Sequence, residues 1–574
     1  MAVALAAAAL AQEPVQPTLG VDPQQNGAVQ PQQQALATLH GVVHISGSGE
    51  PLPRALVSVE GDAATAVLTD GDGKFEVPNL PVGPVIVSIR KPGYLDATSS
   101  ESSQVMDSVA AISHNVMLAA DMPDVEFSLT PTGAIRGQID LSSGDPAEGI
   151  TVSLLRRVLM DGRAGWSQAE STKTRSDGAF RFGGLVPGVY ELYSEPSLDA
   201  EDLNLPVEAG RGTATHQWGF ATVYYPDARD PSGAEKITVE PGATVQANLT
   251  LVREAFQRVT ATANLPQGMA GRNFDFAVQV MDISGRALPY PARFDPNAKM
   301  IEASLPDGSY RLTVTTSPRS QGIIYDGPVR MGGAASLGGA VDLQISGQPV
   351  SNLRVALTEA APIQVQLNVL RSETGAQSSQ GGEVVVTVTP AASLPGQMPD
   401  ESVVSEFASG EFPGPLVGQA VPPGTYWVHT AGIPPGLCES SFTAGGANLA
   451  REPLLIGQAG VQVPLELTLR DDCAKLTLSL PETLAGNRPG EEKFYTMYAI
   501  PDVAFTGNPQ QGTLRPSSGG SATMQGLTPG NYHVYTLEGN APFEYRNPAA
   551  LAALPSQAIT LSPGATADLV VETP

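Results

Sequence analysis

The chain has 574 residues, and its 58 acidic and 32 basic residues give a formal net charge of −26. Such a charge repels phosphate backbones, and no Lys/Arg-rich face is visible, which argues against nucleic-acid binding and against docking on anionic membranes. The 60 glycines and 50 prolines, with few runs of helical period, are typical of many short strands joined by turns. The composition therefore predicts an all-β protein, and the length predicts roughly four to six domains.

The N-terminus has the pattern of an export signal. Residues 1–11 form an alanine-rich apolar run that ends in Ala9-Leu10-Ala11, as in the core and cleavage site of a signal peptide. The usual positive residues are missing, which leaves open both a disordered tail and a true start upstream of Met1. Residues 12–35, rich in Gln, Pro and Gly, are expected to form a disordered leader. No later run reaches the roughly 18 apolar residues of a membrane span, so we expect a periplasmic, cell-surface or extracellular protein.

One motif recurs along the chain. It reads Leu-x-x-Gly-x-Tyr-x-aliphatic, which predicts a tight turn followed by a strand with alternating apolar residues. The copies begin at Leu80, Leu185, Leu305, Val421 and Leu527, and the first has Val85 in place of Tyr. Their spacing is the size of a domain (from 80 to 185 is 105 residues, and from 185 to 305 is 120). The motif thus predicts tandem copies of one module.

A second sequence pattern marks the ends of the modules. Two strands flank Pro241-Gly242 in residues 237–251, and the same arrangement surrounds Pro563-Gly564 near the C-terminus. These closing strands predict five β-sandwich domains with short linkers, arranged as an elongated array. Their boundaries are 36–131, 132–254, 255–361, 362–472 and 473–574.

Several motifs of the first module resemble a known family. Gly41-Val42-Val43, the hairpin Thr69-Asp70-Gly71-Asp72-Gly73-Lys74-Phe75 and Lys91-Pro92-Gly93-Tyr94 are similar to a carboxypeptidase regulatory-like domain, and residues 133–180 repeat the pattern. This resemblance implies a prealbumin-like, Ig-like β-sandwich, related in shape to collagen-adhesin B-type repeats and starch-binding-like modules. The last three modules keep only the turn and its Tyr strand. As a whole the chain resembles exported bacterial proteins with several such repeats, a type frequent in soil acidobacteria.

The residues for catalysis are not in place. A zinc carboxypeptidase needs His-x-x-Glu and a distant His, because zinc takes three protein ligands and one water. None of the six histidines has Glu three residues later: His40, His44, His114, His216, His429 and His533. No nucleophile elbow or phosphate-binding loop occurs in a suitable setting either. A carboxylate pair for glycoside hydrolysis stays open, since its members meet only in space. We predict a non-enzymatic chain without a cofactor.

Two short features remain ambiguous. Asp70 and Asp72 form an acidic loop that is a weak candidate for Ca²⁺, although Asp-Gly steps also build hairpin turns and the loop offers few ligands. Cys438 and Cys473 are the only cysteines, which in an exported chain favours one disulfide over two buried thiols.

Aromatic residues suggest glycan binding. Exposed rings on β-sandwiches hold sugars by stacking on their apolar faces. Alternation along their strands points Trp427 and Tyr535 outward, Trp166 is expected in a loop at 161–168, and the others lie in an irregular segment. The alternative is that these rings pack at domain junctions or under loops. The candidates are Trp427, Tyr535, Trp166, Trp218, Tyr224 and Tyr225.

The function that these features favour is a non-catalytic, exported binding or structural protein of the cell surface or periplasm. The alternatives are a carbohydrate-binding array and an accessory chain of a separate enzyme. Carbohydrate and other surface proteins are the expected partners, and open sheet edges offer a further route to assembly. Neither the ligand nor the oligomeric state can be inferred from the sequence.

Overall fold

The structure is a computed structural model of the chain. It describes residues 35–60, 65–96, 113–198, 216–267, 274–283, 285–296, 298–318, 337–359, 364–372, 383–391, 405–411, 416–418, 424–457, 461, 463–481, 494–502, 509–514, 520–539, 541 and 543–573. The predicted signal peptide, and the predicted leader up to residue 34, lie outside these ranges. Within them nearly all regular structure is β-strand, as predicted, and the one α-helix is α1 (Pro548–Ala552).

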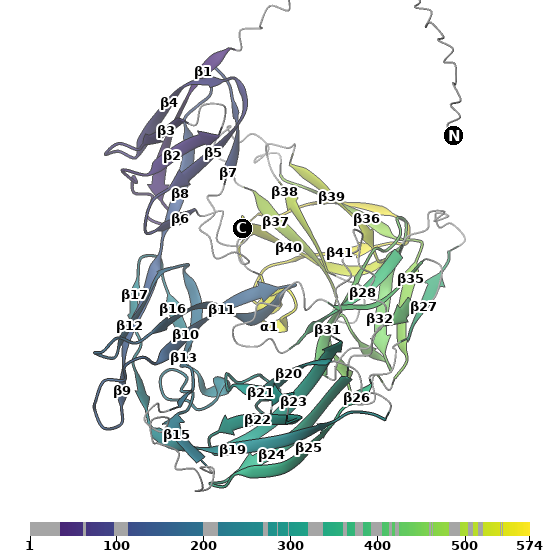
Figure 1. The fold of residues 1–574 in the computed structure, drawn as a ribbon. Coiled ribbons are helices and arrows are strands. Elements are labelled where there is room, and N and C mark those ends of the chain that lie inside the picture. Colours follow the sequence, from purple (N-terminus) through teal and green to yellow (C-terminus); the bar gives the residue numbers. More distant parts are fainter. Residues whose placement is uncertain are drawn as a thin grey trace, which may run out of the picture.

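The buried apolar side chains form five main cores that follow one another along the chain. Figure 1 shows the strands that surround these cores, coloured in chain order. The cores span residues 39–129, 135–251, 221–357, 365–469 and 474–571. Each core defines one domain, and we number the domains from first to fifth. The second and third cores overlap in sequence, so a single cut at residue 254 does not separate the two domains.

The first domain is a sandwich of two four-stranded sheets, β4-β1-β8-β6 and β3-β2-β5-β7. In β4 every second side chain near the start is buried, because successive residues of a strand point to opposite faces. The strands are β1 (Leu36–Ile45), β2 (Leu56–Glu60), β3 (Thr65–Leu68), β4 (Lys74–Pro81), β5 (Gly83–Arg90), β6 (Tyr94–Asp96), β7 (Ser113–Leu118) and β8 (Val125–Pro131).

The second domain repeats this arrangement. Its sheets have the orders β12-β9-β17, with β18 also on β9, and β11-β10-β13-β16. The strands are β9 (Gly133–Leu141), β10 (Thr151–Met160), β11 (Arg163–Lys173), β12 (Ala179–Leu185), β13 (Gly188–Ser194), β16 (Ile237–Val239), β17 (Thr244–Gln246) and β18 (Leu249–Leu251).

The third domain takes strands from both sides of residue 254. Its sheets are β14-β15-β19-β22-β21, with β25 on β19, and β20-β23-β24-β26. Because β15 pairs with β19, part of the span assigned to the second domain belongs to this sheet. The strands are β14 (Ser197–Leu198), β15 (His216–Phe220), β19 (Arg253–Asn264), β20 (Phe274–Met281), β21 (Ala292–Asp295), β22 (Met300–Leu305), β23 (Gly308–Pro318), β24 (Leu337–Ile345), β25 (Val350–Ala356) and β26 (Thr358–Glu359).

The fourth domain is one continuous nine-stranded sheet, β33-β32-β35-β27-β30-β29-β28-β31-β34, which encloses a single core. Its strands are β27 (Gln364–Leu370), β28 (Glu383–Pro390), β29 (Ser405–Glu411), β30 (Leu416–Gly418), β31 (Gly424–Ala431), β32 (Cys438–Ala444), β33 (Ala447–Asn448), β34 (Leu454–Ile456) and β35 (Leu465–Arg470).

The fifth domain returns to two sheets, β39-β36-β42 and β38-β37-β40-β41. The helix α1 lies just before its last two strands. The strands are β36 (Ala474–Ser479), β37 (Tyr495–Pro501), β38 (Gln510–Leu514), β39 (Ser521–Leu527), β40 (Gly530–Glu538), β41 (Gln557–Leu561) and β42 (Thr566–Val570).

All five domains share one long-range pairing. In four of them the first strand pairs in parallel with the last strand or strands; in the third, where β14 and β15 come before β19 and β26 follows β25, the pair is β19 with β25. The pairs are β1 with β8, β9 with β17 and β18, β19 with β25, β27 with β35, and β36 with β42. A parallel pair needs a long connection, and here the whole domain is that connection. The last three domains are therefore copies of the same module, although they lack the Asp-Gly hairpin of the first two.

The recurrent Tyr closes its own turn. The hydroxyl of Tyr190 donates to the carbonyl of Val186, and that of Tyr532 donates to the carbonyl of Thr528 at 2.9 Å. A Cβ at Gly308, in the third copy, would lie 2.8 Å from the Tyr310 hydroxyl. In the third and fourth copies the Tyr ring thus lies where a Cβ would, at Gly308 and Gly424. In the second and fifth copies the glycines have φ of 159° and 154°, which also favour glycine.

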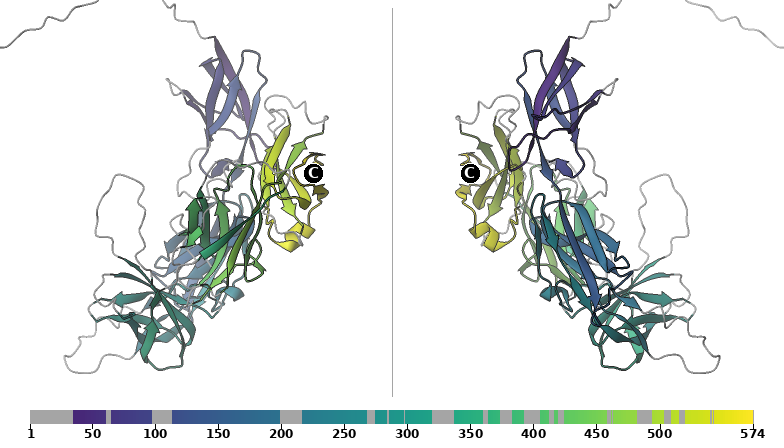
Figure 2. Two further views of the ribbon diagram at one scale, coloured as in Figure 1. Left: turned by 90° about the vertical axis from the view of Figure 1, so that its right-hand side faces the viewer. Right: turned by 90° about the vertical axis from the view of Figure 1, so that its left-hand side faces the viewer.

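The domains do not form the expected elongated array. The first domain stands at one end, and the other four curve so that the fifth returns to the second (Figures 1 and 2). Hydrogen bonds join these two domains across 384 residues of sequence, from Tyr545 to Asp161. A straight array of short-linked domains would keep the second and fifth domains apart, so the expectation of an elongated shape was wrong for this part of the chain.

Candidate functional site: the junction of the second, fourth and fifth domains

One β-hairpin of the second domain makes the contact with the fifth domain. Strands β10 and β11 pair from Thr151 opposite Lys173 to Met160 opposite Arg163, with one register shift between Leu154 and Leu155, and form a long arm. Its tip is Asp161-Gly162, with φ of 48° and 68°, the two positive values that a two-residue hairpin turn requires. A Cβ at Gly162 would lie 2.5 Å from the ring of Tyr545, so glycine also lets the fifth domain close on the tip.

The Asp161 carboxylate accepts hydrogen bonds from side chains of two domains. Its oxygens accept hydrogen bonds from the Tyr545 hydroxyl at 2.7 Å, from Arg163 Nη1 at 2.8 Å and from Arg546 Nη2 at 3.2 Å. Two of these donors come from the fifth domain and one, two residues along the chain, from the arm itself. Charge-assisted bonds of this kind are about twice as strong as neutral ones. One carboxylate thus connects the arm to the fifth domain.

Arg546 binds the backbone of two further domains. Its Nε donates to the carbonyl of Asp161 at 2.9 Å, and its backbone N–H donates to the carbonyl of Gly162 at 3.1 Å. In the fourth domain, the carbonyl of Ala450 accepts from Nη1 of Arg546 and from Nη2 of Arg163. The two guanidinium groups therefore meet at one carbonyl, where the second, fourth and fifth domains come together. We call this place the junction.

Trp427 lies at the junction and not at a free surface. The guanidinium carbon of Arg163 lies 3.7 Å from its ring centroid, a cation–π contact. His429, two residues along β31, has its Nδ1 3.6 Å from Asp161 Oδ2. Alternation along the strand does point both side chains outward, as predicted, but the arm of the second domain covers them. The Arg163 guanidinium thus occupies a face of the half-buried ring on which a sugar would stack.

The electrostatics of the junction follow from its partial burial. Burial works to raise the pKa of the Asp161 carboxyl, but Arg546, the Tyr545 hydroxyl and His429 outweigh it, and the pKa lies below its ordinary value. Burial lowers the pKa of Arg163 to about 10. It also lowers the pKa of His429, against the attraction of Asp161. At neutral pH the junction therefore holds one carboxylate, two guanidinium groups and an imidazole that prefers its neutral form.

The other aromatic candidates lie elsewhere, and most of them are buried. Tyr224 is fully buried and stacks on Tyr193, with ring centroids 5.3 Å apart, so it was wrongly placed among the exposed rings. Tyr535 is 6% exposed and packs against Phe543, which also corrects its assignment as a stacking residue. Tyr225 is half-buried against the second core. Segments of the same chain cover these rings.

The remaining two rings lie in strands, although loops were expected. Trp166 is in β11, where the Lys236 ammonium lies 4.6 Å from its ring centroid. Trp218 is in β15 and keeps 38% of its surface exposed, with the Arg253 guanidinium 5.2 Å from its ring centroid. Of the six predicted stacking residues, Trp218 is the only one among the exposed large hydrophobic residues of the described chain.

A second ionic contact fixes the second domain to the third. The carboxylate of Glu191, on β13, is completely buried. Its Oε1 pairs with Lys236 of the same domain, and its Oε2 accepts from Arg286 Nη2 of the third domain at 3.0 Å. Removing one partner of a buried pair leaves an uncompensated charge, so this contact resists separation of the domains. Ionisable residues again serve a contact between domains.

The acidic loop of the first domain builds a turn. Asp70 Oδ1 accepts the backbone N–H groups of Asp72 at 2.9 Å and Lys74 at 2.8 Å, and Gly73 has a φ of 73°. The carboxylate is thus engaged by the hairpin itself, which favours the turn over the weak Ca²⁺ hypothesis for Asp70 and Asp72. No group of three or more His, Cys, Asp or Glu suited to a metal is found among the described residues.

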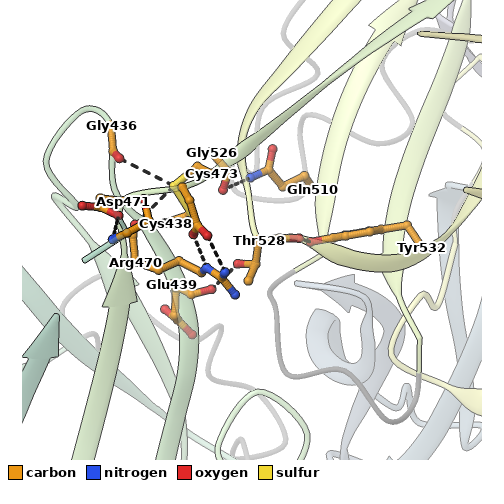
Figure 3. The surroundings of a disulfide bond; sticks show 12 residues. Gly436, Cys438, Glu439, Arg470, Asp471, Cys473, Gln510, Gly526, Thr528 and Tyr532 are labelled. Carbon is orange, nitrogen blue, oxygen red and sulfur yellow. Dashed lines mark hydrogen bonds and ion pairs between the residues drawn. A yellow bond between two sulfur atoms is a disulfide. The ribbon is translucent and has the colours of Figure 1, made fainter. Parts of the chain in front are cut away.

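Cys438 and Cys473 form a disulfide at the boundary of the fourth and fifth domains (Figure 3). The Thr528 hydroxyl of the fifth domain donates to the carbonyl of Glu439, next to the disulfide. The two domains enclose a cavity here of about 270 Å³, lined by Ile433, Leu437, Cys438, Glu439, Pro509, Gln510, Gln525, Gly526 and Thr528. Its size is below the usual range of small-molecule sites, about 300–1,000 Å³, so it is a weaker candidate than the junction.

Sequence reasoning missed the junction, although part of it has a local signal. Asp161-Gly162 between two apolar stretches is a strong hairpin pattern, and it was read as the start of a loop. Tyr545 and Arg546 follow no periodic pattern, and nothing local relates them to residues nearly 400 positions earlier. The arm could have been found from the sequence, whereas its partner could not.

These features define a class of protein: a chain of repeated β-sandwich domains that uses its aromatic and charged side chains to hold its domains together. Its first domain matches a family model, the carboxypeptidase regulatory-like domain, over residues 38–116, which confirms the resemblance there. The second domain lies outside this match but shares one hydrogen bond with the first. In the first domain the buried hydroxyl of Thr69 donates to the carbonyl of Leu52, and in the second the buried hydroxyl of Thr174 donates to the carbonyl of Ala147.

Solved structures give only distant likenesses. The Bacillus anthracis TIE protein is 11% identical over 56% of this chain, which spans 50% of that chain, with a TM-score of 0.16. The minor pilin GBS52 of Streptococcus agalactiae is 15% identical over 38% of this chain and 96% of its own, with a TM-score of 0.19. A streptococcal ancillary pilin is 11% identical over 56% of this chain and 99% of its own, with a TM-score of 0.18. Such TM-scores support no conclusion. Comparison with curated proteins finds no match.

Proposed function

We propose that this chain is a non-catalytic, exported structural protein, in which four domains form a closed body that carries the first domain at one end. The observation that carries the proposal is the junction. There Trp427, Asp161 and two arginines, the residue types that a binding or catalytic site uses, bind other domains of the same chain. A structural protein gains from such contacts because they convert linked domains into one rigid unit.

Export fits the other properties of the chain. A disulfide forms and persists in oxidising compartments, and Cys438 is joined to Cys473. The described part of the chain has no helix that is long and apolar enough to cross a membrane. We propose the periplasm or cell surface as its place, with other surface proteins as partners.

The test has two parts. Cells producing the full chain are fractionated, and intact cells are labelled with a membrane-impermeant amine reagent. We expect the protein in the exported fractions and oxidised at Cys438 and Cys473. The second part compares wild type with Arg546→Ala in a strain that lacks the gene. A structural role predicts that the variant, although exported, fails to restore the wild-type envelope phenotype. Recovery in the cytoplasm, or full restoration by the variant, would contradict the proposal.

Carbohydrate binding is the second candidate, and one observation favours it. Trp218 on β15 exposes 38% of its surface, and Arg253 beside it adds a donor for sugar hydroxyls. Affinity electrophoresis in gels containing starch or other glucans tests it. Retardation that is lost in Trp218→Ala and kept in Trp427→Ala would support this function, whereas unchanged migration in every glucan would refute it.

A further inference from the structure

Two arginines lie side by side on the outer face of the second domain. In the sheet β12-β9-β17, Arg181 on β12 is the direct cross-strand partner of Arg136 on β9. Both side chains are exposed, and Figure 1 shows this sheet on the side of the second domain away from the fifth. Directly opposed side chains have their Cβ atoms about 5 Å apart, and like charges in this position destabilise a sheet. The pair therefore works against the stability of the domain.

In two other places of the chain, arginines that lie together share a carboxylate. Arg258 and Arg293 of the third domain bind the two oxygens of Glu302, at 2.8 and 3.0 Å. The two guanidinium groups of the junction likewise share one carboxylate. In the part of the chain that the structure describes, no carboxylate forms an ion pair with Arg136 or Arg181. The second domain thus has the two guanidinium groups without the anion that accompanies them elsewhere.

The first domain shows that the module does not need this pair. In both domains a glycine follows on the first strand, Gly41 or Gly137, and a Cβ there would lie 2.6 Å from the end of the facing phenylalanine ring. This shared contact identifies equivalent positions in the two sheets. Where the second domain has two opposed arginines, the first has Glu76 opposite His40. The same fold therefore accommodates an acid at this position, and the arginines are not a requirement of the sandwich.

Exposed amide side chains surround the pair. Gln246 on β17 lies beside Arg136, whose Nε donates to its amide oxygen at 3.2 Å. In the next row the Oδ1 of Asn248 accepts from the backbone N–H of Gln138 at 3.0 Å. We call Arg136, Arg181, Gln138, Gln246 and Asn248 the arginine face. None of the exposed large hydrophobic residues of the described chain lies on these strands. Protein partners usually bury apolar residues at the centre of a contact, so the face fits a ligand bound through polar groups alone.

The chemistry of the face indicates its ligand. A guanidinium presents parallel N–H groups that match the two oxygens of a carboxylate, and amide side chains both donate to and accept from hydroxyl groups. We propose that the arginine face binds a polysaccharide that carries carboxylates, that is, one built from uronic acids. The carboxylate of one sugar lies between the guanidinium groups of Arg136 and Arg181, and sugar hydroxyls bond to the three amides. This site is separate from Trp218 and from the junction, and it goes beyond the structural role proposed above.

The net charge of −26 sets the conditions for binding. An acidic glycan is repelled by the chain as a whole, but at about 0.15 M salt this repulsion is screened beyond about 8 Å, whereas the contacts at the face are direct. Exposed ion pairs are individually weak, so a single uronic acid should bind poorly. A polymer offers many carboxylates to the same site, and binding to it should therefore be measurable.

Biolayer interferometry of the full chain on immobilised polygalacturonate tests the proposal, at about 0.15 M salt. The methyl ester of the same polymer is the control ligand, because it keeps the sugar hydroxyls and loses the charge. Wild type should bind the acid form and not the ester. Arg136→Ala and Arg181→Ala should each weaken binding about tenfold, the usual effect of losing one hydrogen bond to a charged group. Arg258→Ala removes an exposed arginine of the third domain, changes the net charge equally and should bind like wild type.

A further variant separates loss of the site from loss of the fold. Arg181→Glu introduces the acid that the first domain has at this position, so it should abolish binding and raise the melting temperature of the second domain, because opposite charges now face each other. Equal binding to acid and ester, unchanged binding in both alanine variants, or a lower melting temperature of Arg181→Glu would overturn the proposal. So would binding only to polyglutamate or only to dextran sulfate. Neutral glucans test Trp218 and the envelope phenotype tests the structural role, so a failure here is distinct from a failure of either.

Discussion

Replacing Asp161 by Asn should loosen the closed body without unfolding a domain. Asn-Gly forms the two-residue turn at least as readily as Asp-Gly, so the arm keeps its tip. The amide still accepts a hydrogen bond but carries no charge. Arg163 and Arg546, whose side chains are only 17% and 15% exposed, then lose their shared anion. The substitution therefore isolates the charge of the junction from its shape.

The magnitude follows from the exposure of the carboxylate. An exposed ion pair contributes up to about 1 kcal/mol, and breaking a fully buried one costs about 3–5 kcal/mol. The Asp161 side chain keeps 32% of its surface, so we place the loss between these limits, at about 2 kcal/mol. A change of 1.4 kcal/mol is tenfold in an equilibrium constant, so the opened state should become roughly 30 times more populated.

Hydrogen exchange can read this opening at one amide. The backbone N–H of Arg546 donates to the carbonyl of Gly162 and is protected only while the fifth domain contacts the arm. We expect exchange at Arg546 to accelerate about 30-fold in Asp161→Asn, while the amides of the domain cores stay unchanged.

The matched control is Asp342→Asn. Its carboxylate also pairs with an arginine, Arg311, but its side chain is 71% exposed and lies within one domain. It should leave exchange at Arg546 unchanged. If Asp161→Asn also leaves that amide at its wild-type rate, the carboxylate does not hold the junction and the reasoning fails.

Three further perturbations have defined outcomes. Acidification should weaken the junction in two stages, first below about pH 6.5 because the pKa of His429 is lowered, and again below about pH 4 because the pKa of Asp161 is lowered. Each contribution to stability is complete above the ordinary pKa of the group and is lost as the pH falls through the lowered pKa. Hydrogen exchange at the Arg546 amide, corrected for its intrinsic rate, measures both stages. A junction that tightens in acid would contradict this sign. Reduction of the disulfide, whose cysteines are 35 residues apart, should cost about 4 kcal/mol, seen by calorimetry as a lower melting temperature of the fourth domain; an unchanged transition would refute the estimate. Tyr532→Phe removes one buried hydrogen bond and should destabilise the fifth domain by about 1 kcal/mol in the same assay, a loss that would be absent if the hydroxyl were solvated.

The repeated module could be predicted because its signals are local. Leu185, Gly188 and Tyr190 lie within six residues of one another, and the ring closes the turn that the glycine opens. The same spacing returns in each copy, so the number of domains follows from counting. The parallel pairing of first and last strands was not visible, since it joins residues such as Gly41 and Val125 that are far apart in sequence.

The contacts between domains could not be predicted for the same reason. Alternation along β31 correctly points Trp427 outward, but whether an outward ring meets water, a sugar or another domain depends on distant residues. Here the answer is Arg163, on an arm from another domain. Tyr224 and Tyr535 show the same limit: a local pattern gives the direction of a side chain, and only tertiary structure shows what covers it.

The closed arrangement of the last four domains can be measured directly. Both native cysteines are in the disulfide, so Gln168→Cys on β11 and Ala553→Cys after α1 provide two unique exposed sites for spin labels. Double electron–electron resonance on the full chain should give one short, narrow distance between the second and fifth domains. The same labels in Asp161→Asn should show a second, longer component. A single broad and long distribution in the unmodified junction, as for domains on a flexible string, would contradict the closed body.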